Sequence, residues 1–465
     1  MERTKDSDAG ELMLESILCK LGRKKWAGLA IQAPRSHVMP IDGVAMDLVV
    51  CLDRSKSMGR YWPIVIETLN KGVTKLTARD RLGIRTFAGQ RHSQSVLELT
   101  EMSKEGQDKA LEAIRSIPKP SSGHTNLGAA LEEGLDELLQ NLTTDPNQPE
   151  RAVRLLLYTD GKPTVGIRRC VAHHHYLGQI QMVRVVPHTF VNALRLAELL
   201  EVREQKMTKL GPSAKVAVFA YGENHDVKVL KSICNNYSSL YFAVTDQNIV
   251  LCLGEFYGGT RTTFFRDLVL SVRGPRDCEV RTTFHCKSLS LPQADVRKWE
   301  IHIPDMQSSE RRNVIIKIPE SVRGGEVHFG LQYYSIVTKS VVTLSRTLDI
   351  VRDVSFDDGT KITMDEQRNR MSSINVLRQA IASAAVHDWE EAQTLVAKQR
   401  RRIDHSIARN APLTRQMSRQ LEHYRETFRR RGRQQAASGY TPPVRIGFRE
   451  EAEMSAFCTP PPPIN

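Results

Sequence analysis

The chain has 465 residues, which is long enough for two or three domains. Its content of 40% hydrophobic and 26% charged residues indicates a folded, globular protein and excludes a largely disordered one. The net charge of +13 is unevenly placed: residues 398–433 hold twelve Lys or Arg against three acidic residues, a net +9 that leaves +4 for the rest.

The N-terminus and the cysteines favour an intracellular protein. Residues 1–25 form an N-terminal segment without an apolar stretch long enough for a secretory signal, and no segment approaches the length of a membrane helix. The eight cysteines are scattered and include no CxxC pair, which is typical of a reduced compartment. The sequence therefore predicts a cytoplasmic location and no membrane association.

From residue 46 to residue 258, short apolar segments alternate with segments that have helical periodicity. Strands are expected at 46–52, 81–88, 95–99, 153–158, 216–221 and 240–244. Alternating strands and helices predict an α/β domain with a doubly wound, mostly parallel, Rossmann-like sheet. The alternating segment 95–99 is expected at an edge of this sheet.

Oxygen-bearing side chains follow the expected strands at three points. Asp53, Ser55 and Ser57 come directly after the first strand, Thr125 opens a helix, and Asp160 follows the strand 153–158. Because the carboxyl ends of parallel strands meet at one edge, these loops should converge there. Two carboxylates and three hydroxyls are hard oxygen ligands that suit Mg²⁺ or Mn²⁺, with waters completing an octahedron.

This pattern resembles the metal-ion-dependent adhesion site (MIDAS) of von Willebrand factor A (VWA) domains. All five positions match: Asp53, Ser55, Ser57, Thr125 and Asp160. The resemblance implies a domain over about 46–258 and a bound divalent metal. It also implies a protein partner that fills the vacant metal position with a Glu or Asp carboxylate.

The connection after Asp160 is longer than an ordinary crossover, with an insertion at about 168–212. It could lie beside the metal and influence partner choice, or it could be a lengthened surface helix and loop. The run His173–His175 could suggest a metal, but adjacent histidines rarely face one ion together.

The segments on both sides of the α/β domain have a different character. Trp26 to Ala33, within the segment 26–40, resembles a strand, and residues 262–352 contain six more strand-like runs whose spacing suits a β-sandwich. If the first strand completes that sandwich, the α/β domain is inserted within it. The alternative is two domains in succession.

Residues 362–432 turn helical and predict an antiparallel helical pair, and residues 434–465 form a Pro-containing tail expected to be disordered. The helical segment resembles a C-terminal module that follows A domains in some eukaryotic intracellular proteins. Some of those proteins carry a RING finger or U-box. Since no such Cys/His ladder is present here, ubiquitin ligation is not implied by this chain alone.

The sequence leaves three hypotheses for the function. The favoured one is an intracellular scaffold or interaction module that binds a partner carboxylate through the metal. The others are a nucleic-acid-associated protein using the basic arm 398–433, and an adaptor in ubiquitin transfer. Nucleic acid is less favoured because no aromatic residues are interleaved to stack bases. Catalysis is not expected, since neither a phosphate-binding glycine loop nor a GxSxG elbow is present and His124 is the only candidate base near the serines.

Overall fold

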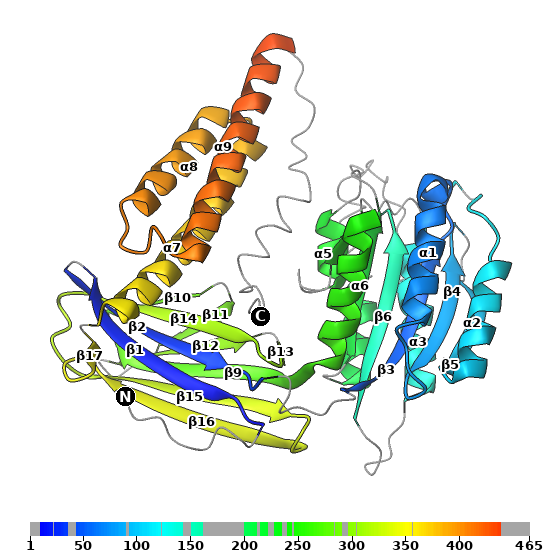
Figure 1. Ribbon diagram of the computed structural model, residues 1–465, viewed down its shortest axis with the longest axis horizontal. Coiled ribbons are helices and arrows are strands. Elements are labelled where there is room, and N and C mark those ends of the chain that lie inside the picture. Colours follow the sequence, from blue (N-terminus) through cyan, green and yellow to red (C-terminus); the bar gives the residue numbers. More distant parts are fainter. Residues whose placement is uncertain are drawn as a thin grey trace, which may run out of the picture. The chain divides into compact units, whose positions relative to one another are not determined.

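The computed structural model describes residues 10–438, apart from 22, 36–42, 90–92, 122, 143–149, 161–199, 212–213, 222–226, 235–239, 244–245, 283, 291–295, 304 and 356 (Figure 1). The chain divides into two compact units. One is an α/β domain over Asp42–Thr263, and the other combines Met1–Ile41 with Phe264–Asn465. Within the described part of the chain, no helix has the length and apolar character needed to cross a membrane.

The α/β domain is built on one sheet with the strand order β5-β4-β3-β6-β7-β8. Neighbouring strands are parallel except for β5, which pairs antiparallel with β4 at the edge. The predicted doubly wound α/β fold is confirmed, including the edge position of the segment 95–99. The strands are β3 (Ala45–Asp53), β4 (Arg81–Phe87), β5 (Gln94–Glu101), β6 (Arg151–Thr159), β7 (Ala214–Tyr221) and β8 (Leu240–Ala243).

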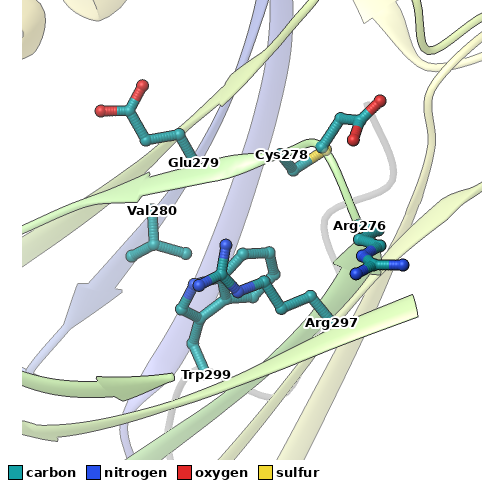
Figure 2. A pocket seen from close by; sticks show the side chains of 7 residues that line it. Arg276, Cys278, Glu279, Val280, Arg297 and Trp299 are labelled. Carbon is teal, nitrogen blue, oxygen red and sulfur yellow. The ribbon is translucent and has the colours of Figure 1, made fainter. Parts of the chain in front are cut away.

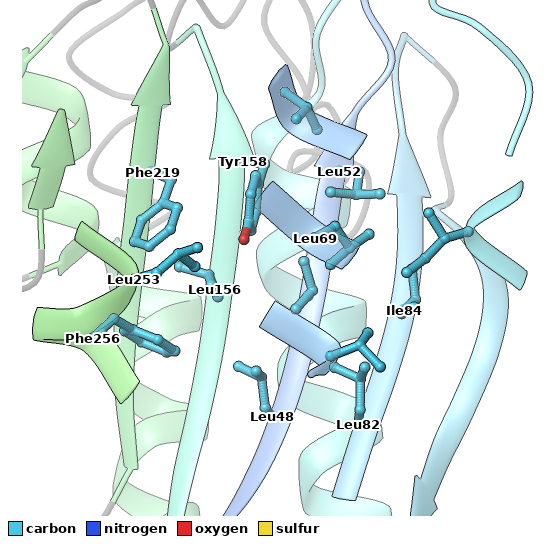
Figure 3. Close-up of a cluster of buried hydrophobic side chains, with 14 of the residues drawn as sticks. Leu48, Leu52, Leu69, Leu82, Ile84, Leu156, Tyr158, Phe219, Leu253 and Phe256 are labelled. Atoms are coloured by element: carbon cyan, nitrogen blue, oxygen red, sulfur yellow. The ribbon is translucent and has the colours of Figure 1, made fainter. Parts of the chain in front are cut away.

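Helices cover both faces of this sheet, so the central strand β3 is buried along its whole length. Figure 3 shows the core on one face, where Leu48, Leu156 and Phe219 of the sheet meet Leu69 of α1 and Phe256 of α6. The opposite face receives α3. The helices are η2 (Lys56–Tyr61), α1 (Trp62–Val73), α2 (Lys104–Ser116), α3 (Leu127–Gln140), α5 (Val227–Cys234) and α6 (Asp246–Arg261), and residues 200–210 are also helical.

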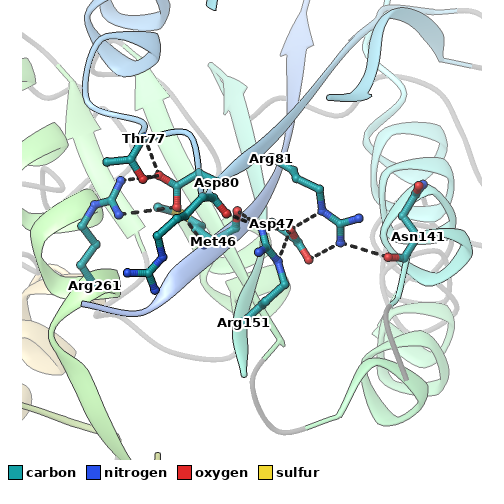
Figure 4. Close-up of polar contacts among 9 residues, drawn as sticks. Met46, Asp47, Thr77, Asp80, Arg81, Asn141, Arg151 and Arg261 are labelled. Carbon is teal, nitrogen blue, oxygen red and sulfur yellow. Dashed lines mark hydrogen bonds and ion pairs between the residues drawn. The ribbon is translucent and has the colours of Figure 1, made fainter. Parts of the chain in front are cut away.

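Ion pairs join the elements at the amino ends of the central strands (Figure 4). Asp47 accepts hydrogen bonds from Arg81 Nε at 2.7 Å and from Arg151 Nε at 2.8 Å. The buried Asp80 carboxylate accepts from Arg261 at the end of α6. Because each carboxylate here has an arginine partner, the charges at this edge are largely neutralised.

The second unit contains two sheets that form a β-sandwich (Figure 1). One has the order β10-β14-β2-β1-β17, and the other has the order β11-β12-β9-β15-β16 with β13 beside β9. Burial alternates along β15, as expected for a strand with one face in a core. The strands are β1 (Met13–Leu21), β2 (Lys24–Gln32), β9 (Thr263–Pro275), β10 (Glu279–Arg281), β11 (His285–Ser290), β12 (Val296–Ile303), β13 (Met306–Gln307), β14 (Arg311–Ile318), β15 (Glu326–Ser335), β16 (Ser340–Asp349) and β17 (Val354–Ser355).

The α/β domain is inserted into the sandwich along the chain. β1 and β2 precede that domain, yet β2 pairs antiparallel with β14, which follows it. The chain enters and leaves the α/β domain at one place, where Val44 N donates to Arg261 O at 3.0 Å. The expected N-terminal segment 1–25 must be corrected, because it contains β1, whose hairpin partner β2 begins at Lys24.

The helical region contains three described helices, so the prediction of a helical pair was wrong. They are α7 (Asp358–Ala385), α8 (Trp389–Asp404) and α9 (Pro412–Ser438). A turn at Val386–Asp388 divides the first expected helix, with His387 at a φ of 66°. α9 continues to Ser438, past the expected start of the tail at residue 434, and residues 439–465 lie outside the described part.

Candidate metal centre

The candidate ligands gather at the carboxyl edge of the central strands. β3 ends at Asp53 and Asp160 directly follows β6, and these strands are parallel neighbours with Leu52 opposite Tyr158. The chain proceeds from β3 to β4 and β5 on one side and later returns to β6 on the other. The edge between β3 and β6 is therefore the topological switch point, where ligands bind in sheets of this kind.

Both oxygens of the Asp53 carboxylate are held in place. Oδ1 accepts from the Ser55 backbone N–H at 2.8 Å, and Oδ2 accepts from Thr159 Oγ1 at 2.7 Å. The side chain is fully buried, and this burial raises its pKa to about 6 against the hydrogen bonds from Ser55 and Thr159, which lower it. The negative charge of Asp160 raises it further. An oriented carboxylate is thus kept in surroundings that do not solvate its charge.

One carboxylate oxygen of Asp160 is buried and unpaired within the described part of the chain. The residue is 6% exposed, and its Oδ1 is buried without a hydrogen-bond donor among the described residues. Buried polar atoms of folded proteins are nearly always paired, so an orphaned carboxylate oxygen calls for a donor, a water or an ion. Two adjacent buried carboxylates, one with an orphaned oxygen, match the demands of a divalent cation.

Two of the three hydroxyl candidates, Ser55 and Ser57, lie next to each other beside Asp53. Ser55 Oγ lies 3.1 Å from Ser57 Oγ; Ser55 is buried and Ser57 is exposed. Thr125 is buried in the loop before α3, and a 2.8 Å hydrogen bond from Asn126 N to Ala88 O joins this loop to the residue that directly follows β4. Direct contacts connect Asp53 with Ser55 and Ser55 with Ser57, while Thr125 is brought to this edge by its loop.

The donor set fits a hard divalent cation. No group of three His, Cys, Asp or Glu that could hold a metal occurs in the described part of the chain, so any ion here would rely on two carboxylates and neutral hydroxyl oxygens. Mg²⁺ is bound in this manner, through one or two carboxylates with waters and other oxygens. The histidine run His173–His175 lies outside the described residues.

A buried charge network holds α3, and with it the Thr125 loop. Arg85 of β4 donates to Glu137 Oε2 at 2.9 Å and to Glu133 Oε2 at 3.2 Å, both on α3. At Gly134 a Cβ would lie 2.6 Å from Leu155 Cδ1, so only glycine permits this close approach of helix and sheet. The sequence analysis did not predict this network. Its signal was two Glu residues spaced four apart on one helix, together with an Arg within a buried strand, which indicate an ion pair between helix and sheet.

A groove in the sandwich provides a second concave surface (Figure 2). The Arg297 guanidinium carbon lies 5.7 Å from the centre of the Trp299 ring. Two arginines and two acidic residues line the pocket, so no single charge of ligand is favoured. The lining residues are Arg276, Asp277, Cys278, Glu279, Val280, Arg297 and Trp299.

The basic arm 398–433 falls on α8, α9 and the turn between them. Two of its acidic residues form ion pairs with arginines of the same arm: Glu422 pairs with Arg400 and Arg425, and Glu426 pairs with Arg429 at 2.5 Å. The buried side of the helices forms an apolar core that includes Val396, Leu421 and Tyr424. Further arginines are exposed at positions 401, 402, 409, 415, 419, 430 and 433.

Comparison with known proteins identifies the α/β domain. Residues 47–253 match the family model of the von Willebrand factor type A domain. A comparison with curated protein sequences gave no match.

One solved structure resembles this chain in fold with a TM-score above 0.5. A von Willebrand factor type A protein from Catenulispora acidiphila has a TM-score of 0.51 at 12% identity, over 85% of this chain and 88% of that one. The ArnB paralogue VWA2 from Sulfolobus acidocaldarius has a TM-score of 0.46 at 15% identity, over 90% and 97%. The human COPII-coat protein Sec24c has a TM-score of 0.44 at 11% identity, over 80% and 52%.

Proposed function

Because residues 47–253 form a von Willebrand factor type A domain, typically a protein-interaction module, we propose that this chain binds a protein partner through a divalent cation. Asp53, Ser55, Ser57, Thr125 and Asp160 would hold the ion, with Mg²⁺ favoured and Mn²⁺ an alternative. Since the two carboxylates only balance the charge of the ion and the other three ligands are neutral, the ion stays electrophilic and can accept a Glu or Asp carboxylate from the partner. In this proposal the site binds and does not catalyse.

The observation that carries the proposal is the orphaned Asp160 Oδ1 beside the buried Asp53 carboxylate. Two like charges in a poorly solvated place destabilise the domain unless a counter-charge compensates them. The nearby arginine Arg54 donates its Nε to Pro118 O at 3.0 Å and has no ion pair among the described residues. A bound cation would supply the missing charge.

Metal binding is tested by the rise in melting temperature when Mg²⁺ or Mn²⁺ is added to protein stripped with EDTA. Binding to the folded state raises stability, so wild type should melt higher with metal. Asp53→Ala and Asp160→Ala should show no rise. Asp108→Ala, which removes an exposed carboxylate from α2, is the matched control and should respond like wild type. An equal response from all four proteins would refute the metal site.

Partner binding is tested by pull-down from native lysate in Mg²⁺ and in EDTA. Proteins retained by wild type in Mg²⁺, and lost both in EDTA and with Asp53→Ala, would identify the docking point and the partners. Retention under every condition would show that the metal is not the docking point. Attention would then turn to the alternatives of nucleic-acid binding by the basic arm and an adaptor role in ubiquitin transfer, the latter resting on sequence resemblance alone. Phosphate binding by the arm should weaken steeply with salt and be insensitive to EDTA.

A further inference from the structure

Four basic side chains lie on the two segments that carry Ser55, Ser57 and Thr125. Arg54, Lys56 and Arg60 follow Asp53 within one short segment, and Lys119 lies in the loop that leads to Thr125. We call these four residues the basic rim. The loop is bonded to the segment after β3: Arg54 Nε donates to Pro118 O at 3.0 Å, and Ser121 N donates to Arg54 O at 3.3 Å.

Two of the four cations already have a contact. Arg54 is half-buried and bonded to the Pro118 carbonyl, and the Arg60 guanidinium carbon lies 4.5 Å from the centre of the Tyr61 ring. Lys56 and Lys119 are exposed, and neither makes an ion pair among the described residues. Their ammonium groups are therefore available to a partner that approaches the metal.

Acidic residues are lacking around the rim. Within the described residues of 54–61 and 117–126 there is no Asp or Glu, so neither loop carries a carboxylate of its own. Elsewhere in the same domain several arginines form ion pairs with carboxylates. Arg81 and Arg151 pair with Asp47, and Arg261 pairs with Asp80 (Figure 4). Among the described residues, the loops 54–61 and 117–126 therefore carry positive charge and no acidic side chain.

We infer that the basic rim selects a partner segment in which the metal-binding carboxylate is flanked by further Asp or Glu residues. This inference rests on the proposed function, since the metal supplies the anchor. The rim would contribute recognition of flanking charge and faster, salt-sensitive association, which complementary charges provide at interfaces. A partner with an isolated carboxylate among neutral residues would gain only the metal contact.

The expected size of the effect follows from exposed ion pairs. Such a pair contributes on the order of a twofold to fivefold gain in affinity, and salt weakens it. Two lysines acting together should therefore favour an acidic segment over a neutral one by about tenfold at low salt.

The test uses two fluorescent synthetic peptides of equal length as probes, one with a single Glu among Ser and Gly, the other with the same Glu flanked by Asp residues. Anisotropy titrations with the full chain in Mg²⁺ give the ratio of the two affinities. Wild type should prefer the acidic peptide by about tenfold. Lys56→Ala combined with Lys119→Ala should reduce this ratio to about twofold. The affinity for the single-Glu peptide should stay nearly unchanged.

The control variant is Lys104→Ala combined with Lys109→Ala, which removes two exposed lysines from α2 and should keep the wild-type ratio. Melting temperatures in EDTA check that both double variants are folded. A ratio that stays at the wild-type value in the rim variant, or that is near one in wild type, overturns the inference while Mg²⁺-dependent binding still supports the proposed function. If neither peptide binds better in Mg²⁺ than in EDTA, both the proposed function and the inference are refuted.

Discussion

Arg261, the last residue of α6, donates from Nη2 to Oδ2 of the fully buried Asp80 at 2.5 Å. Asp80 also accepts from the backbone N–H groups of Thr77 and Met46, at 2.7 and 2.9 Å. One carboxylate thus joins the last helix of the domain, the loop before β4 and the start of β3. Because this edge lies opposite the candidate metal centre, its contribution to folding can be examined separately from binding.

Arg261→Ala should destabilise the α/β domain by about 3 kcal/mol, since removing one partner leaves a buried charge uncompensated. Urea unfolding followed by circular dichroism measures the change. Lys75→Ala, an exposed neighbour of equal charge, should change stability by less than about 0.5 kcal/mol. Equal effects from the two variants would show that the pair with Asp80 adds no stability.

Asp53→Asn should separate metal binding from folding. Burial raises the pKa of the Asp53 carboxyl from 3.8 to about 6, so between these values the folded apoprotein binds more protons than the unfolded chain. Its stability in EDTA should then fall as the pH rises from about 4 to about 6. Removing this ionisation should make Asp53→Asn more stable than wild type at pH 7 in EDTA, by about 1–2 kcal/mol.

Melting curves in EDTA at pH 4.5 and 7.5, repeated with Mg²⁺ at pH 7.5, check this prediction. In the variant, the part of the pH dependence of stability that comes from ionisation of Asp53 should disappear. The rise in melting temperature on adding metal should disappear as well. A variant less stable than wild type at pH 7.5 in EDTA would mean that the hydrogen bonds from Ser55 and Thr159 outweigh the cost of burying the charge.

Two buried tyrosines should respond oppositely to loss of their hydroxyl groups. Tyr158 is fully buried in the sheet core, and its hydroxyl has no hydrogen-bond partner among the described residues. The Tyr333 hydroxyl accepts from Leu12 N at 3.2 Å. Tyr158→Phe should therefore stabilise the protein by about 1 kcal/mol, and Tyr333→Phe should destabilise it by a similar amount. Chemical denaturation of both variants provides the comparison, and a loss of stability in Tyr158→Phe would indicate a buried water on its hydroxyl.

The turn between α7 and α8 offers a test of backbone strain. His387 has a φ of 66°, a conformation that glycine adopts without steric cost. His387→Gly should stabilise the helical region by about 0.5–1 kcal/mol.

Asp388→Ala should destabilise the helical region by about 1 kcal/mol, because the Asp388 side chain accepts a hydrogen bond from Glu391 N at 3.0 Å and caps α8. Thermal unfolding at 222 nm measures both, and a destabilised glycine variant would show that the imidazole ring contributes packing that outweighs the strain.

The sequence allowed the central sheet and the candidate ligands to be predicted because their signals are local. Strands such as β3 and β6 are buried on both faces and read as continuous apolar runs, and each ligand follows its strand directly. The structure brings Asp53, Ser55 and Ser57 into contact and sets Asp160 beside them. Whether they bind metal remains a prediction for the experiments above.

Other features were missed because their signals are weak or depend on distant residues. β1 carries Glu15 and Lys20 and exposes part of its length, so its pattern is not that of a core strand. The break after α7 contains neither Gly nor Pro, since His387 takes the positive φ that usually marks such a turn. The pairing of Asp80 with Arg261 joins residues far apart in sequence, which no local pattern can show.

The insertion of the α/β domain has a consequence for the order in which the protein folds during synthesis. β1 and β2 are made before the α/β domain and form a hairpin, but the strand that covers the other edge of β2 is β14, which is made after that domain. An unpartnered strand edge promotes aggregation while it waits. Because the hydrogen bond from Val44 N to Arg261 O joins the entry and exit of the A domain, folding of that domain shortens the effective loop between Gln32 and Arg311. Early folding of the A domain should therefore speed closure of the sandwich on the nascent chain.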